Sequence, residues 1–129
     1  MTAINPARLA TALHACASGI RPLEAATDLL IDCGNWLHRK DFTSRFITTG
    51  ASISDSDTLL ASTDWEAAIT ALNTGELPSS SSERHMLLLA ASIAGGIPVS
   101  LFATLPGIDH RNARHLVKAI AHATGLHPS

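Results

Sequence analysis

Several residue types and patterns are scarce in this sequence, and each scarcity excludes a class of protein. Tyrosine is missing, and aromatic residues make up only 4% of the chain. No apolar run approaches the ~18 residues that span a bilayer, so we expect no transmembrane helix and no membrane partner. The first 20 residues lack a basic segment followed by a continuous apolar stretch. We therefore expect no secretory signal and a cytoplasmic protein.

Cysteine is also scarce. The two cysteines, Cys16 and Cys33, are not spaced as C-x-x-C, and both fall inside predicted helices. We interpret them as small buried hydrophobic residues. A disulfide between the first two helices stays geometrically open, but a reducing compartment argues against it.

Motifs of catalysis and of cofactor binding are missing as well. The serine run Ser79–Ser82 lacks the G-x-S-x-G pattern, and no glycine-rich phosphate loop occurs. His115 and His122 lie two helical turns apart, about 10 Å, which is too far for one metal ion. The sequence therefore predicts no enzyme, no catalytic residue, no cofactor and no metal.

What the chain does contain is apolar residues that favour helices. The hydrophobic fraction is 46% and the charged fraction 16%, which is typical of an ordinary globular protein. Much of the apolar share is alanine and leucine, which enter helices at little cost. We predict an all-α fold, a compact single-domain bundle of five to six helices over residues 1–129.

The first half predicts a helical hairpin over about residues 5–40. Asn5 and Pro6 are good residues to begin its first helix, and Gly19 to end it. The second helix is predicted from Pro22 to Lys40. Residues 48–62 are rich in serine, threonine and aspartate, and we predict a loop there.

The C-terminal half, about residues 63–125, is predicted to be helical. Two stretches have the spacing of a capping box, in which a hydroxyl and a glutamate cap each other's backbone amides. The helix after the second box is apolar around most of its circumference, so we expect it to form the buried centre of the domain. The first box pairs Thr63 with Glu66, and the second pairs Ser80 with Glu83.

The last predicted helix, from Asp109 to Gly125, is amphipathic. At 100° per residue its apolar side chains fall on one arc: Ala113, Leu116, Val117, Ile120 and Ala123. The opposite arc contains no acid and forms our candidate contact surface: His110, Arg111, Arg114, His115, Lys118 and His122.

Charge is distributed unevenly between the two parts of the chain. Residues 1–82 contain nine acids and five bases, a net charge of −4, whereas residues 83–129 contain two acids and four bases, a net charge of +2. Such an asymmetry can indicate an end that binds a polyanion. The net charge of the whole chain, −2, opposes that reading.

Two functions therefore stay open. The first is a non-catalytic protein–protein interaction module whose partner is another protein or a second copy of itself. The second is a helix-turn-helix-like nucleic-acid-binding protein, because the order of buried helix, short helix, Pro-Gly turn and basic helix follows that motif. In the second case Arg111, Arg114 and Lys118 would contact phosphates.

The second half of the sequence also resembles a known group. It contains W-x-x-A-I, then L-x-x-G-x-L-P-x-S-x-x-E, L-x-L-A-A-S and D-x-R-N, and finally A-x-x-H-A-x-G. In these motifs residues 64–125 resemble the C-terminal part of small uncharacterised actinobacterial proteins. The N-terminal half matches only through a helix with a tryptophan, followed by F-x-x-x-F. The resemblance implies no activity and assigns no functional residue.

Overall fold

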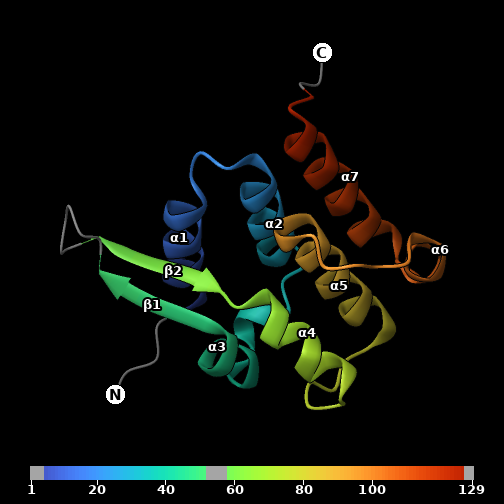
Figure 1. Cartoon of the computed structure of the whole chain (residues 1–129), viewed down its shortest axis with the longest axis horizontal. Coiled ribbons are helices and arrows are strands. Elements are labelled where there is room, and N and C mark those ends of the chain that lie inside the picture. Colours follow the sequence, from blue (N-terminus) through green and yellow to red (C-terminus); the bar gives the residue numbers. More distant parts are fainter. Residues whose placement is uncertain (1–4, 52–57, 127–129) are drawn as a thin grey trace.

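The computed structural model describes residues 5–51 and 58–126 (Figure 1). These residues form seven α-helices, two 3-10 turns and a two-stranded antiparallel sheet. In chain order the elements are α1 (Pro6–Ala17), α2 (Arg21–Asp32), η1 (Trp36–His38), α3 (Lys40–Phe46), β1 (Ile47–Ala51), β2 (Leu59–Thr63), α4 (Trp65–Asn73), α5 (Ser81–Gly95), α6 (Leu101–Thr104), η2 (Leu105–Gly107) and α7 (His110–Thr124).

The prediction of an all-α bundle of five to six helices was wrong, and the hairpin is the main reason. Part of the predicted loop at 48–62 forms β1 and β2, which pair from Ile47 opposite Thr63 to Ala51 opposite Leu59. Residues 52–57 of that loop lie outside the described residues. The hairpin packs across α1 through β2 (Figure 1), with Ala61 buried.

The predicted second helix was also wrong in its length. It ends at Asp32 rather than Lys40, because Gly34 adopts a left-handed backbone with φ of 80°. Glycine reaches this left-handed conformation without steric cost, and a residue in that conformation cannot continue a right-handed helix. The chain then turns through η1 and begins α3 at Lys40.

Most helix ends follow their sequence signals. The capping box at Ser80 is confirmed: the Glu83 amide donates to Ser80 Oγ at 3.2 Å, and the Ser80 amide donates to Glu83 Oε1 at 3.0 Å. The box predicted at Thr63 is wrong, because Thr63 ends β2. Asp64 caps α4 instead and accepts the Ala67 amide at 3.1 Å.

The core lies between α2 and α5. α5 packs against α2, α4 and α7, and its buried residues include Met86 and Leu87, in agreement with its predicted central place. Trp36 of η1 and Phe42 of α3 are fully buried, with ring centroids 5.2 Å apart. Burial of aromatic rings of this size supplies a large share of the apolar area that stabilises a small domain.

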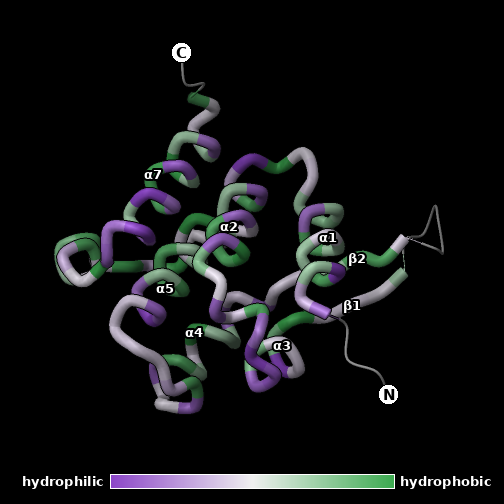
Figure 2. The backbone as a smooth tube through the Cα atoms, turned by 180° about the vertical axis from the view of Figure 1, so that it is seen from behind, coloured by the Kyte–Doolittle hydropathy of each residue, from purple (hydrophilic) through white to green (hydrophobic). Residues whose placement is uncertain are grey.

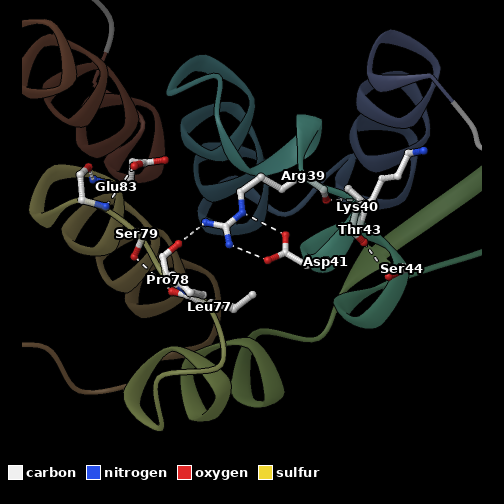
Figure 3. A network of polar contacts seen from close by, with 10 residues as sticks. Arg39, Lys40, Asp41, Thr43, Ser44, Leu77, Pro78, Ser79 and Glu83 are labelled. Carbon is white, nitrogen blue, oxygen red and sulfur yellow. Dashed lines mark hydrogen bonds and ion pairs between the residues drawn. The ribbon is translucent and has the colours of Figure 1, made fainter.

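Arg39 joins segments that lie far apart in the sequence (Figure 3). Its guanidinium donates to the Pro78 carbonyl at 2.7 Å and to both carboxylate oxygens of Asp41, at 3.0 and 2.6 Å. It also lies 4.7 Å from the centroid of the Trp36 ring. The paired guanidinium lowers the pKa of Asp41. These contacts fix the segment that precedes α5 against η1 and α3.

We expect the stability of the protein to depend on pH because the thiol of Cys33 is buried. Burial raises the pKa of its thiol from 9.0 to about 11. Between these values the unfolded chain loses a proton that the folded chain keeps, so the free energy of unfolding falls as pH rises, by about 1.4 kcal/mol per unit at most. Urea denaturation at several pH values checks this expectation.

Two cysteine variants control that measurement. In Cys33→Ala the contribution of the thiol is absent, so the fall in stability above pH 9 becomes shallower than in the wild type. Cys16 is exposed, and Cys16→Ala is expected to keep the wild-type slope. Equal slopes for Cys33→Ala and the wild type would contradict the assignment.

Candidate functional site

The start of α7 is fixed by a polar cluster. Asp109 caps the helix and accepts the backbone amide of Asn112 at 2.8 Å. The buried side chain of Asn112 donates to Ser82 Oγ at 2.8 Å, and Ser82 donates to Asp109 at 3.2 Å. The Asn112 amide and the Ser82 hydroxyl lower the pKa of Asp109. The cluster therefore joins the start of α7 to the first turn of α5.

One flank of α7 packs against a row of acids on α2. Glu24, Asp28 and Asp32 are spaced four residues apart, so they share one face of that helix. His122 Nε2 lies 3.0 Å from Glu24, and its hydrogen bond lowers the pKa of that carboxyl. On the other side of the row, His14 of α1 lies 3.4 Å from Asp28.

Asp32 is shared by two side chains of the same flank. Lys118 Nζ lies 3.6 Å from its carboxylate, and His115 Nδ1 lies 3.8 Å from it. The other ring nitrogen of His115 is buried and has no hydrogen-bond partner among the described residues. Exposed ion pairs of this kind each contribute little to the free energy of unfolding. Their main effect is therefore on the orientation of α7.

The structure thus divides the six predicted surface residues into two groups. His115, Lys118 and His122 are paired with α2, although the amine end of Lys118 stays largely exposed. The other three lie on the exposed side of the first two turns of α7 and form no ion pair with the described residues: His110, Arg111 and Arg114.

The apolar arc of α7 is only partly covered. Leu116 and Ala119 are buried against the core. Val117 and Ile120 are 67% and 50% exposed. The helix is therefore rotated about its axis: part of its polar flank lies on α2, and part of its apolar arc faces solvent. The sequence pattern shows that both arcs exist but does not show which neighbour each one meets.

More apolar side chains are exposed next to the start of α7. Phe102 of α6 is 94% exposed, and its neighbours Leu101 and Leu105 are 54% and 44% exposed. Figure 2 shows the α6 turn at the outer edge of the molecule, with much of its backbone in the colour of hydrophobic residues. Leu126, just after α7, is 68% exposed. We call the exposed apolar residues of α6, η2 and α7 the α6–α7 face: Leu101, Phe102, Leu105, Val117 and Ile120.

An open groove of about 520 Å³ runs beside α7, next to that face. The α7 side chains that line it include both cationic and apolar ones, and no serine, threonine, cysteine or tyrosine contributes to its wall. The groove holds the side chain of His122, which is also paired with Glu24. Such a pair can move a proton. Its lining residues are Asp28, Asp32, Arg114, His115, Val117, Lys118, Ala119, Ala121, His122 and Leu126.

Metal sites and membrane-spanning helices are two further possibilities for the described residues. Within residues 5–51 and 58–126, no three histidine, cysteine or acidic side chains are grouped so that they could hold a metal ion. In the same part of the chain, no helix has the length and apolar character needed to cross a membrane.

Comparison with known proteins assigns the chain to no family. The chain matches no protein-family model, no curated protein and no solved structure. The exposed side chains of α6 and η2 are the part that sequence reasoning missed. Their signal is the run Leu101-Phe102 in a helix of only four residues, with Leu105 just after it.

Proposed function

We propose that this protein is a non-catalytic protein-interaction module and that the α6–α7 face is its contact surface. The observation that supports this most strongly is Phe102, whose ring is 94% exposed. Burying a side chain of this size gains about 1.5–3 kcal/mol. Leu101 and Leu105 are exposed beside it, and a group of exposed apolar side chains on a monomer is typical of a protein-binding site.

The chemistry of the same face favours protein binding over catalysis. Its side chains are aliphatic or aromatic, so none of them can transfer a proton or attack a substrate. Large aromatic and aliphatic anchors are the residues that contribute most to binding at protein interfaces. We propose a cytoplasmic location, since the exposed free thiol of Cys16 suits a reducing compartment.

Nucleic-acid binding is the second candidate, favoured by the exposed Arg111 and Arg114. Three other members of the predicted basic surface are already paired with acids of α2, which reduces the number of phosphate contacts available. Apolar side chains beside these arginines also suit a protein partner better than a duplex. A salt-dependent mobility shift on random-sequence DNA, lost in Arg111→Glu with Arg114→Glu, would favour this candidate over the first.

Site-specific photo-crosslinking in the native host cells tests the first candidate. Benzoylphenylalanine in place of Phe102 is expected to give a discrete protein adduct on irradiation. The same group in place of Thr49 is the matched control, because Thr49 is exposed on β1, and the hairpin lies beside α1, away from α6 and α7 (Figure 1). No adduct from position 102, or equal adducts from both positions, would contradict the proposal.

A further inference from the structure

A small pocket of about 140 Å³ lies where α1, α2 and the end of β2 meet, on the opposite side of the domain from α6 (Figure 1). Much of its wall is apolar, with Leu13 of α1 and Leu23 of α2 among the side chains that line it. The described residues of the wall include no charged side chain. Pockets for drug-sized ligands usually measure about 300–1,000 Å³, so this one suits a smaller molecule.

Thr27 of α2 lines this pocket with a hydroxyl that the fold leaves unused. The residue is only 4% exposed, and its hydroxyl forms no hydrogen bond with the described residues. Other helical threonines of the chain donate to a carbonyl one turn earlier: Thr11 to Ala7 at 3.1 Å and Thr104 to Ser100 at 2.8 Å. A buried hydroxyl without a partner costs free energy, and such groups are usually paired. The small exposed part of Thr27 opens into the pocket, so an occupant of the pocket can supply the missing partner.

Two further side chains with polar atoms line the same pocket. Trp65, at the start of α4, is partly buried, and its indole N–H has no partner in the part of the chain that the structure describes. Cys16 of α1 contributes an exposed free thiol. A hydroxyl and an indole N–H can both donate a hydrogen bond, so an occupant with an acceptor oxygen suits them. The wall offers no counter-charge, and a charge buried without one is costly, so the occupant is uncharged.

We propose that this pocket binds a small uncharged carbonyl compound, such as a short amide or ketone. Its oxygen accepts a hydrogen bond from the hydroxyl of Thr27, and its carbon skeleton packs against Leu13 and Leu23. An apolar wall with a few polar groups that fix orientation is the usual construction of a ligand site. The inference goes beyond the proposed function, because the pocket is separate from the α6–α7 face.

The thiol of Cys16 allows the pocket to be probed by disulfide exchange. Its thiolate attacks one sulfur of a small disulfide; a new S–S bond forms as the old one breaks, and the other half leaves as a thiolate. Oxidised N-acetylcysteamine leaves an arm with an amide carbonyl on Cys16. Cystamine leaves an arm that ends in an ammonium group, and dithiodipropionate leaves one that ends in a carboxylate.

Competition among the three arms tests the proposal. The variant Cys33→Ala keeps Cys16 as its one thiol, so intact mass spectrometry at exchange equilibrium gives the adduct ratios both in the folded and in the urea-unfolded chain. Relative to the unfolded chain, the folded chain is expected to favour the amide arm over both charged arms by about fivefold, the size of effect of one hydrogen bond. Equal ratios in the two states would mean that the pocket holds only water, and would overturn the proposal.

Matched threonine variants locate the hydrogen bond. Thr27→Val keeps the shape of the side chain without its hydroxyl, and it is expected to remove the preference for the amide arm. The midpoint of thermal unfolding is expected to stay or rise in the same variant, because the hydroxyl has no partner in the empty pocket. Thr11→Val, on the exposed side of α1, is expected to keep the preference. A preference that survives Thr27→Val, or a lower midpoint in that variant, would overturn the assignment of the hydroxyl.

A variant of the α6–α7 face separates this inference from the proposed function. Phe102→Ser is expected to leave the adduct ratios at Cys16 unchanged, because α6 lies on the opposite side of the domain (Figure 1). Loss of the amide preference in that variant would overturn the location of the site. Crosslinking from position 102 reports on the protein partner alone, so either proposal can fail without the other.

Discussion

Trp36→Ala is expected to lower the free energy of unfolding by about 3–5 kcal/mol, the range measured for large aromatic residues deleted from cores. The indole is fully buried and packs against Phe42, with 5.2 Å between ring centroids. Its Nε1 donates to the Glu83 carbonyl at 3.2 Å, and the Arg39 guanidinium lies over the ring. Urea denaturation followed by circular dichroism measures the loss.

Trp36→Phe is the matched control for that variant. Phenylalanine keeps an apolar ring at the site but cannot donate to Glu83, so we expect a smaller loss, with about 1 kcal/mol from the missing hydrogen bond. If both variants lost the same stability, the packing of the indole would not be what holds η1 on the core.

Leu87→Ala is expected to cost about 2–5 kcal/mol. Leu87 is fully buried at the centre of α5, where that helix meets its neighbours, so the truncation leaves a cavity that cannot collapse fully. Leu88→Ala is the control, because the next residue is only partly buried and its deletion removes less apolar area. Thermal or urea denaturation that gave equal losses for the two variants would contradict this picture of the core.

Local signals in the sequence predicted much of the helical structure. The caps at Asn5, Ser80 and Asp109 are side chains that bond amides three residues away, so nothing distant is needed to predict them. The ends at Gly96 and Gly125 follow from the left-handed conformation that glycine adopts there. These signals were sufficient because both partners of each contact lie within one helical turn.

The hairpin and the break after α2 were missed because they depend on more than local pattern. β1 and β2 are five residues each, with serine, threonine and glycine among them, and their apolar alternation is too short to separate from a loop. The pattern that predicts a helix from Pro22 to Lys40 runs through Gly34 without a break. Its left-handed conformation is favoured because the chain must turn to bring Trp36 into the core.

The candidate site, too, could be predicted only where it depends on local spacing. The sequence identified α7 and its two arcs, because both depend on helical spacing alone. The acids of α2 are also visible in the sequence at a spacing of four, but their partners on α7 lie about 90 residues further along the chain. Which part of each arc is covered is set by that long-range packing, and this is why the exposure of Val117 and Ile120 could not be predicted.

The way α7 is anchored has a mechanical consequence. Leu116 is its only large apolar side chain that the core buries; its other buried residues are Ala119 and Asn112. Because α7 also packs extensively along α2, we expect it to move with that helix rather than apart from it. The exposed side chains of α7, Val117 and Ile120 among them, are therefore held in a fixed orientation relative to the core.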